Sequence, residues 1–294
     1  MPVFNRSEAP AHALRRLLAA PGLLVAPGAG DALTARLIVE AGFSAVYASG
    51  AAIANTLLGA PDIGLVSFTE SLETVRHICE SVAAPVIADA DTGYGNAVNV
   101  LRTVRAFEAA GAAAIQLEDQ VSPKRCGHFD GKEVIEAAEM AQKIRAAVDA
   151  RRDSAFVIIA RTDSLATHGF EEAVRRGRRY AEAGADVIFV DAPITREQVA
   201  ALPAAVGAPM LFNMVEGAKT PLFSHTELVT FGYRIVIHPS LVLRVAAKAG
   251  LEALRALKRN GDSRDALPRM LDWDERQRLV QLPEYIALEK RYAQ

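Results

Sequence analysis

The stretch Ala114–His128, AIQLEDQVSPKRCGH, decides how the rest of the chain is interpreted. Its apolar start, residues 114–117, ends at two carboxylates, Glu118 and Asp119, and a polar loop follows. This is the pattern of a buried strand that carries acids at its carboxyl end. Parallel α/β proteins place their chemistry at that end of the strands. The stretch therefore predicts a parallel α/β fold with a functional site beside Glu118.

The loop after this strand places a thiol among bases: Lys124, Arg125, Cys126, Gly127 and His128. Positive neighbours favour the thiolate, so we expect the pKa of the Cys126 thiol to be lowered. Taken alone, the loop is equally consistent with a chance cysteine among ordinary solvated charges. The remainder of the chain has to decide between these two interpretations.

Short apolar runs alternate with helical segments along most of the chain, and the runs are continuously apolar, as in strands buried on both faces. The expected strands are Leu23–Ala26, Ala45–Ala48, Pro85–Ala88, Ala114–Leu117, Phe156–Ala160, Val187–Val190, Pro209–Phe212 and Ile235–Ile237. Eight such βα units predict a (β/α)8 barrel of the triosephosphate isomerase (TIM) type, with an open doubly wound sheet as the alternative. No GxGxxG follows the first strand, so a dinucleotide site is weakly supported.

Segments at both ends of the chain lie outside this alternation of strands and helices. A helix is expected over Ser7–Ala20, and after the eighth strand helical segments are expected over Ser240–Lys258 and Trp273–Tyr292. We therefore expect residues 1–260 to form the barrel with its N-terminal helix. Residues 261–294 form a C-terminal helical extension of the same domain assembly. Because a barrel already has its eight helices, the apolar stripe of the extension must be buried on its own barrel or on a neighbouring chain.

Composition excludes several classes of protein. The 294 residues are 51% hydrophobic and 23% charged, with a net charge of -2, so nothing attracts nucleic acid or an anionic membrane surface. Two cysteines are no disulfide framework and favour a reducing compartment. No apolar run approaches the ~18 residues that a membrane span needs, and the N-terminus lacks the apolar core of a signal peptide. We expect a soluble cytoplasmic protein without nucleic-acid or membrane partners.

Polar residues end most of the expected strands, and a barrel would bring them to one mouth. They are Ser49, Asp89, Asp91, Glu118, Asp119, Arg161, Asp163, Asp191 and Asn213. Three converging acids, Asp89, Asp91 and Glu118, would repel one another without a cation. Their oxygens suit Mg²⁺, with Mn²⁺ also possible, and no histidine cluster suggests zinc.

Two features of the mouth could bind a substrate. Arg161 is expected to act as a fork for a substrate carboxylate. The loop Ser49–Gly50–Ala51 could hold a second carboxylate through its backbone N–H groups. Asp163 is instead expected to be a helix cap or a turn former.

The chain resembles the isocitrate lyase / phosphoenolpyruvate mutase superfamily nearly from end to end. The motifs that carry the resemblance are YASGAAIANTLLGAPDIG, DADTGYGN, EDQ with PKRCGH, ARTD and NMVEGAKTPL. KRCGH is typical of the lyase branch, that of methylisocitrate lyase and 2,3-dimethylmalate lyase, in which its cysteine is the catalytic acid. Where many members carry Glu after the sixth strand, this chain has Asp191, which is one methylene shorter. SGAA replaces the commoner SGGG-like loop.

The resemblance implies Mg²⁺ bound at Asp91, with Asp89 and Glu118 holding metal-bound waters. It implies a homotetramer whose protomers exchange their C-terminal helices. It further implies a small carboxylate substrate contacted by Tyr47, Ser49, Gly50, Ala51, Asp62, Gly127, His128, Arg161 and Asn213.

The expected reaction is a retro-aldol cleavage of a 2-hydroxy di- or tricarboxylate, of the 2,3-dimethylmalate or 2-methylisocitrate type, to pyruvate and a second carboxylate. Tyr47 or Asp62 would remove the hydroxyl proton, and Cys126, tuned by Lys124 and His128, would protonate the carbanion. Oxaloacetate hydrolysis or decarboxylation and phosphonate chemistry remain alternatives within the superfamily. A non-catalytic binding barrel should lack the acid cluster or the thiol, and this chain has both.

Overall fold

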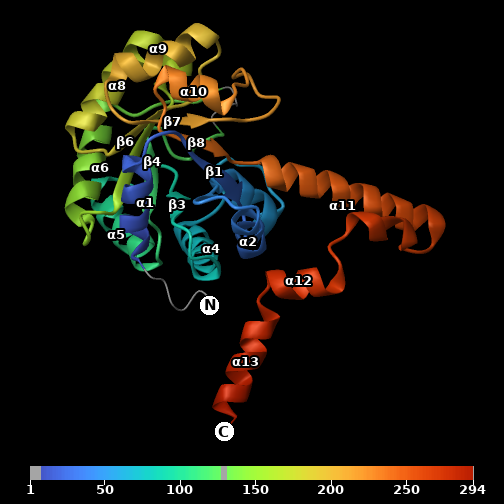
Figure 1. The fold of residues 1–294 in the computed structure, drawn as a ribbon. Helices are drawn as coiled ribbons and strands as arrows, with labels where there is room; N and C mark the ends of the chain where they lie inside the picture. Colours follow the sequence, from blue (N-terminus) through green and yellow to red (C-terminus); the bar gives the residue numbers. More distant parts are fainter. Residues whose placement is uncertain (1–7, 127–130, 294) are drawn as a thin grey trace.

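The computed structural model describes residues 8–126 and 131–293, and within them eight parallel strands close into a barrel (Figure 1). Each strand pairs with its neighbours in sequence, and β1 pairs with β8 to close the barrel. The strands are β1 Leu24–Ala29, β2 Val46–Ala48, β3 Val86–Asp89, β4 Ala114–Glu118, β5 Val157–Thr162, β6 Val187–Val190, β7 Met210–Asn213 and β8 Ile235–His238. The predicted (β/α)8 barrel is confirmed, and the open-sheet alternative is wrong.

Helices alternate with the strands and surround the barrel (Figure 1). They are α1 Pro10–Ala19, α2 Ala32–Glu40, α3 Gly50–Ile53, α4 Phe68–Ser81, α5 Ala97–Ala109, α6 Ala137–Ala150, α7 Ser164–His168, α8 Phe170–Glu182, α9 Arg196–Val206, α10 His225–Phe231, α11 Leu241–Asn260, α12 Trp273–Leu279 and α13 Leu282–Tyr292. A π-helical turn, Ala54–Leu58, continues α3, and a 3-10 turn, Arg264–Arg269, follows α11. The side chains of Asp31 and Thr195 cap α2 and α9 by accepting the backbone N–H groups of Thr34 and Gln198.

Side chains alternate between the inside of the barrel and the surrounding helix layer, because successive residues of a strand point to opposite faces. Along β4, Ala114 joins the apolar cluster inside the barrel. Its neighbours Ile115 and Leu117 join the outer cluster against the helices. The same period directs Gln116 and Glu118 inward, and both are fully buried. The polar side chains of β4 thus point inward from the carboxyl half of the strand.

The opposite end of the barrel is closed by α1. Leu14 is fully buried and packs in the inner cluster, with Leu17 and Leu18 against it. Arg15 donates to the carbonyl oxygen of Ala155 (2.9 Å) and pairs with Asp186 (2.8 Å), so the helix is bound to residues that precede β5 and β6. This end of the barrel is therefore an apolar plug with polar contacts around its rim.

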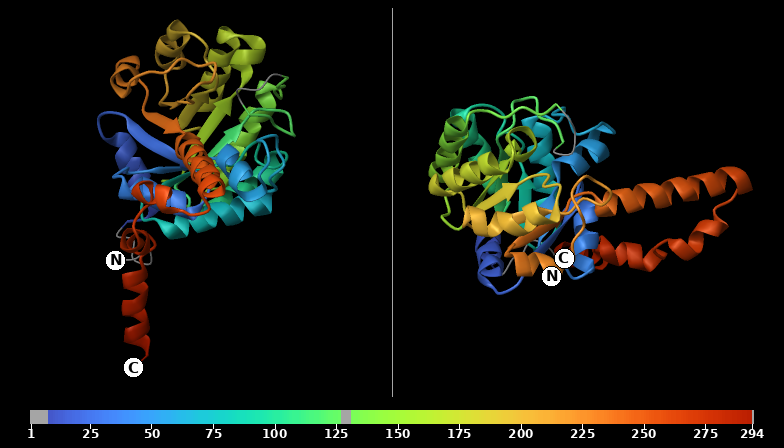
Figure 2. Two further views of the ribbon diagram at one scale, coloured as in Figure 1. Left: turned by 90° about the vertical axis from the view of Figure 1, so that its right-hand side faces the viewer. Right: turned by 90° about the horizontal axis from the view of Figure 1, so that it is seen from above.

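The C-terminal extension leaves the barrel. Helix α11 projects away from it, and the chain turns back at the outer end of α11 (Figures 1 and 2). Helix α12 then lies below α11 and contacts α2, where Arg36 donates to the carbonyl oxygen of Leu279, and α13 extends further below. Of the twenty residues of α11 only Ala256 is buried. Trp273, at the start of α12, is likewise 69% exposed. The expected segment Trp273–Tyr292 is divided into two helices at Gln281, whose backbone is left-handed with φ 61°. No helix in the described part of the chain is long and apolar enough to cross a membrane.

Candidate active site

The carboxyl ends of the strands enclose a cavity of about 80 Å³ that brings together most of the residues expected at the site. Its walls come from strands that are far apart in sequence, so the barrel alone creates it. It is lined by Tyr47, Ser49, Ala51, Asp62, Asp89, Cys126, Arg161, Phe189, Asp191, Asn213, Val215, Ile237, Pro239 and Ser240. Nine of these fourteen residues were expected from the sequence at the catalytic, substrate-binding or metal site.

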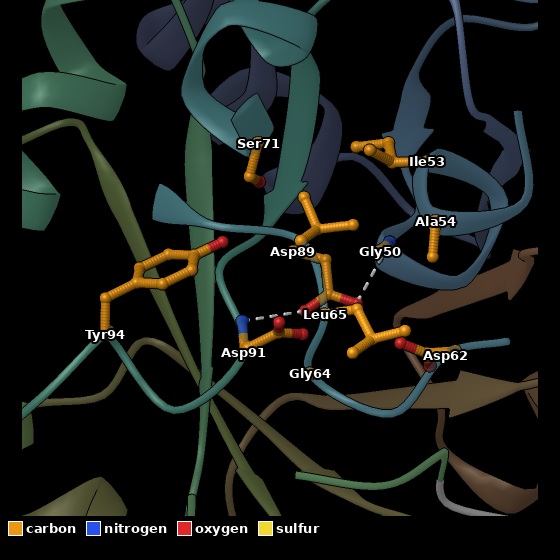
Figure 3. Close-up of a pocket in the computed structure, with 11 residues that line it drawn as sticks. Gly50, Ile53, Ala54, Asp62, Gly64, Leu65, Ser71, Asp89, Asp91 and Tyr94 are labelled. Carbon is orange, nitrogen blue, oxygen red and sulfur yellow. Dashed lines mark hydrogen bonds between the residues drawn. The ribbon is translucent and has the colours of Figure 1, made fainter. Parts of the chain in front are cut away.

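The acid pair Asp89 and Asp91 lies at the start of the loop after β3, in an adjoining hollow (Figure 3). Asp89 ends the strand, and Asp91 follows with a left-handed backbone, φ 47°. Asp89 accepts the N–H of Asp91 at Oδ1 (3.2 Å) and the N–H of Gly50 at Oδ2 (3.3 Å). A Cβ at Gly50 would stand 3.0 Å from Asp89 Oδ2, so a larger residue here would displace the Asp89 carboxylate. The Gly50 N–H therefore serves Asp89 rather than a substrate carboxylate.

Helices behind the barrel hold the turn of this loop in place. Lys143 of α6 is buried and donates to the carbonyl oxygen of Thr92 (3.1 Å). Thr103 of α5 donates to the carbonyl oxygen of Gly93 (3.0 Å). Two helices thus satisfy carbonyl groups that the irregular turn leaves without strand partners, and this fixes the position of Asp91.

Lys124 enters the site as the partner of two acids. Its Nζ lies 2.5 Å from Asp62 Oδ1 and 2.9 Å from Asp91 Oδ1, and the residue is 4% exposed. Burial alone would lower the pKa of Lys124, but the surrounding carboxylates, Asp91 foremost, raise it well above its ordinary value. We had expected this ammonium to tune the thiol of Cys126. The structure shows it engaged by the acid cluster instead.

Glu118 and Asp91 are acids held out of water. Burial, partly offset by Arg161 and Lys124, raises the pKa of Glu118 well above its ordinary value. Burial also raises the pKa of Asp91 to about 6, against the attraction of Lys124. In the part of the chain that the structure describes, both Glu118 oxygens and Asp91 Oδ1 accept no hydrogen bond, although Arg161 and Lys124 lie within ion-pair distance.

The charges of the described mouth residues do not balance. Six carboxylates stand against three cationic side chains: Asp62, Asp89, Asp91, Glu118, Asp163 and Asp191 against Lys124, Lys132 and Arg161. A hard divalent cation would remove this excess and would occupy the carboxylate oxygens that lack hydrogen bonds.

No group of three or more His, Cys, Asp or Glu side chains within residues 8–126 and 131–293 converges on a single point as direct metal ligands. That geometry agrees with one carboxylate on the ion and the other acids reaching it through water. The residues present therefore fit Mg²⁺ or Mn²⁺.

Arg161, at the end of β5, is less available to a substrate than the sequence suggested. Its Nε and Nη2 donate to Asp163 (2.8 and 2.9 Å), and Nη2 also donates to Asp191 (2.9 Å). The third nitrogen, Nη1, lies 3.3 Å from Glu118 Oε2. The expected two-pronged fork toward a substrate carboxylate is thus occupied by protein carboxylates, which leaves Nη1 as the nitrogen with spare donor capacity.

Asp191 reaches its partners although it is shorter than glutamate. It accepts from Arg161 Nη2 and from the side-chain amide of Asn213 (3.1 Å), and it is fully buried. The shorter side chain of Asp191 thus still contacts two other residues that line the cavity. Ser49, which also lines the cavity, caps α3 by accepting the N–H of Ala52 (3.3 Å).

Tyr47 and Asp89 are linked through a glutamine that sequence reasoning did not single out. Tyr47 donates to Gln116 Oε1 (3.0 Å), and Gln116 Nε2 donates to Asp89 Oδ1 (3.2 Å). Burial and then the charge of Asp89 raise the pKa of Tyr47 well above its ordinary value. A polar residue inside the apolar run AIQLE, two positions before Glu118 and on the same face, was the signal that could have revealed it.

Cys126 lines the cavity, and its backbone N–H donates to the carbonyl oxygen of Asp62 (3.0 Å). The thiol loop is thereby joined to the loop that carries Asp62. Gly127 and His128, which were also expected at the site, lie outside the described residues.

Asp119 and Asp163 do not behave as expected. Asp119 follows the inward-facing Glu118 and so points outward, where it accepts from Thr162, Tyr180 and Arg176 behind the β5 strand. Its expected place in the mouth is wrong. The side chain of Asp163 makes no cap hydrogen bond to α7. It lies between Arg161 and Lys132 (3.1 Å), whose charges overcome the effect of burial and lower its pKa to about 2.

Comparison with known proteins agrees with this architecture. The phosphoenolpyruvate phosphomutase family profile matches residues 14–258. The chain is 45% identical to the 2,3-dimethylmalate lyase of Eubacterium barkeri over 95% of this chain and 97% of that one. It is 44% identical to the 2-methylisocitrate lyase of Aeropyrum pernix, over 98% of this chain and 91% of the other.

Two solved structures show the same fold along almost the whole chain. A 2,3-dimethylmalate lyase superposes with a TM-score of 0.92 at 40% identity, covering 97% of this chain and 96% of that one. A phosphonopyruvate hydrolase, solved with oxalate and Mg²⁺, superposes with a TM-score of 0.89 at 35% identity, covering 98% and 100%. The barrel, its charged mouth and these similarities together show that the chain belongs to the phosphoenolpyruvate phosphomutase family, within the isocitrate lyase superfamily.

Proposed function

We propose that the protein is a carbon–carbon lyase that cleaves a 2-hydroxy di- or tricarboxylate to pyruvate and a second carboxylate. The observation that supports this is one cavity holding a thiol, Cys126, together with Tyr47, Asp62, Asp89 and Arg161. A lyase of this kind needs a group to take the hydroxyl proton, a cationic environment for the carboxylates, and an acid for the carbanion. The names of the related lyases agree with this reaction class.

Mg²⁺ would be held by Asp91 directly and by Asp89 and Glu118 through water, and Mn²⁺ could replace it. When bound, such an ion supplies Lewis acidity that lowers the pKa of a chelated hydroxyl group. The buried oxygens without hydrogen bonds and the excess of carboxylates support this assignment. The divalent ion would also lower the pKa of Asp91 and keep that carboxylate ionised at neutral pH.

The chain's own groups divide the remaining work. Asp62 takes the proton of the 2-hydroxyl group as the carbon–oxygen bond becomes a carbonyl. Tyr47, whose raised pKa keeps it protonated, accepts a hydrogen bond from that hydroxyl group. The C2–C3 electron pair moves onto C3, where the adjacent carboxylate spreads the charge as an enolate. Cys126 then delivers its proton to C3, with His128 adjusting the thiol. Ser49, Ala51 and Asn213, which line the cavity, orient the substrate carboxylates together with Gly127 and Arg161 Nη1, whereas the Gly50 N–H positions Asp89.

A panel of 2-hydroxy and 2-oxo dicarboxylates tests this proposal. Each acid is incubated with the full chain and Mg²⁺, and pyruvate and oxalate are assayed separately. We expect pyruvate from 2,3-dimethylmalate or 2-methylisocitrate. Oxalate from oxaloacetate, with no pyruvate from any 2-hydroxy acid, would instead identify a hydrolase.

We further propose that residues 261–294 form a C-terminal extension exchanged between protomers of a homotetramer. Support comes from apolar side chains of the extension that its own barrel leaves exposed, among them Leu267 (63%) and Trp273 (69%). Exposed apolar patches of this extent mark contact surfaces. Deleting residues 271–294 should lower the molar mass measured by light scattering, whereas an unchanged oligomer of unchanged stability would contradict exchange.

A further inference from the structure

Gln116 occupies a special place beneath the cavity. It belongs to β4, faces the inside of the barrel and is fully buried. Both ends of its side-chain amide are used, since Oε1 accepts from Tyr47 (3.0 Å) and Nε2 donates to Asp89 (3.2 Å). A buried amide whose partners are both residues of the site directs their hydrogen bonds as well as filling space.

Asp89 determines which way the amide faces. Its Oδ1 and Oδ2 already accept the backbone N–H groups of Asp91 and Gly50, so Asp89 acts as an acceptor on every side. The amide nitrogen of Gln116, the end that can donate, must therefore face Asp89. The amide oxygen must face Tyr47, and the reverse orientation would set two acceptors against each other.

The hydroxyl group of Tyr47 has one proton, and it donates that proton in its hydrogen bond to the amide oxygen of Gln116. Tyr47 is 2% exposed and lines the cavity, so its oxygen can offer only lone pairs to a molecule bound there. A ligand hydroxyl can donate to those lone pairs. A ligand carbonyl oxygen cannot, because it is itself an acceptor, and it would lose its hydrogen bond to water without replacement.

We propose that Gln116 determines substrate selectivity by fixing Tyr47 as a hydrogen-bond acceptor, so that the cavity selects a carbon bearing a hydroxyl group over the corresponding carbonyl. This inference rests on the proposed function and deepens it, because it separates 2-hydroxy acids from 2-oxo acids at one named position. Gln116 acts through Tyr47 and is a positioning residue.

The test compares ligands that differ only in this group and that cannot be cleaved. Calorimetric titrations of the full chain in Mg²⁺ use lactate against pyruvate, and 2-hydroxyglutarate against 2-oxoglutarate, with both enantiomers of each hydroxy acid. We expect the better enantiomer to bind about 3- to 10-fold more tightly than its oxo partner, as one neutral hydrogen bond would give.

Two variants and one control assign the preference. Tyr47→Phe removes the acceptor and should bring the ratio close to one. Gln116→Met keeps the side-chain length but frees the Tyr47 proton, so the oxo acid should gain at the expense of the hydroxy acid. Tyr233→Phe makes the same chemical change at a buried tyrosine that donates to the carbonyl oxygen of Val199 in the helix layer, and should leave the ratio unchanged.

A ratio within one protein is insensitive to partly misfolded material, so the result is readable even for a weakened variant. Equal binding of hydroxy and oxo acids to the wild type would overturn this inference alone. Equal losses for both ligands in Tyr47→Phe and Gln116→Met would reduce Gln116 to a packing residue. If no carboxylate binds in Mg²⁺, the site itself and the proposed function fail as well.

Discussion

The carboxyl end of this barrel is lined by charged side chains, whereas its amino end is filled by apolar ones. At the carboxyl end lie two acids, the fully buried Glu118 and the partly buried Asp91, and burial raises the pKa values of both. At the amino end, α1 plugs the barrel with Leu14, and the ion pair of Arg15 with Asp186 lies at its rim. Burying apolar surface stabilises a fold, whereas burying incompletely paired charge costs stability. The comparison teaches that activity and stability are located at different ends, and each substitution below tests one of them.

Asp91→Asn should have the largest effect, on activity alone. Lewis acidity is worth several kcal/mol in a transition state, so we expect kcat to fall about 1,000-fold or more. Asparagine tolerates the left-handed backbone and removes one of the carboxylates that outnumber the cations at the mouth, while Lys124 keeps Asp62 as its partner. The melting temperature without metal should therefore not fall. Steady-state kinetics with and without EDTA checks the first expectation, and thermal unfolding checks the second. A metal-free wild type with full activity would contradict the site.

Cys126→Ser should lower kcat about 100-fold, the low end of what a general acid contributes. Serine keeps the size of the side chain but holds its proton far more tightly. Ligand binding should change little, because the other groups that line the cavity remain. The check is single-turnover cleavage of the substrate that the panel identifies, with calorimetric binding of pyruvate as the control. Near-wild-type turnover would exclude the thiol as the acid.

Leu14→Ala should reverse this pattern at the opposite end. Removing a fully buried leucine should cost about 2–5 kcal/mol of unfolding free energy. The mouth lies at the other end of the strands, so kcat at 25 °C should stay within about twofold of the wild type for the fraction that remains folded. Urea unfolding and an activity assay on the same sample measure both. A large loss of kcat with intact stability would show that the two ends are not separable.

The pH dependence of stability should show the smallest effect. Burial raises the pKa of Asp91 from 3.8 to about 6, so between these values the folded, metal-free protein binds more protons than the unfolded chain. Stability contributed at this site is therefore present below pH 4 and is lost as the pH rises toward 6, by at most about 1.4 kcal/mol per pH unit.

The difference between the wild type and Asp91→Asn isolates this effect, because exposed acids with lowered pKa values contribute equally to both proteins. Excess Mg²⁺ should remove the loss of wild-type stability between pH 4 and 6, because the ion keeps Asp91 ionised in the folded protein. If the unfolding free energy of the metal-free wild type instead rose relative to that of Asp91→Asn as the pH increased, Asp91 would be stabilised as a carboxylate without any metal.

The barrel and its inward-facing residues were predictable because they follow from a period of two. Once β4 was recognised, the strand ended at Glu118, and equivalent positions yielded Asp89, Arg161 and Asn213. The same rule, applied to single residues, would have removed Asp119 from the mouth and added Gln116. These two errors arose from treating the strand end as a cluster of residues rather than as two alternating faces.

The rest depended on loop geometry that has no repeat. Nothing in PKRCGH indicates that Lys124 pairs with Asp62, which lies sixty-two residues earlier in the chain. Lys132 carried no signal of its contact with Asp163 either. The break at Gln281 depends on a left-handed residue that is not glycine, which sequence patterns rarely indicate.

The left-handed turn at Asp91 also limits how this site can change. A φ of 47° is tolerated by glycine, asparagine and aspartate, and for other residues it costs about 1–2 kcal/mol of conformational free energy. Of the tolerated residues, only aspartate supplies a carboxylate, so even glutamate, with the same charge, would meet a conformational barrier before any question of chemistry arose. In a mutagenesis library this position should therefore be nearly invariant for two independent reasons. Compensating changes should accumulate instead at its neighbours across the hollow, Lys124 and Asp62.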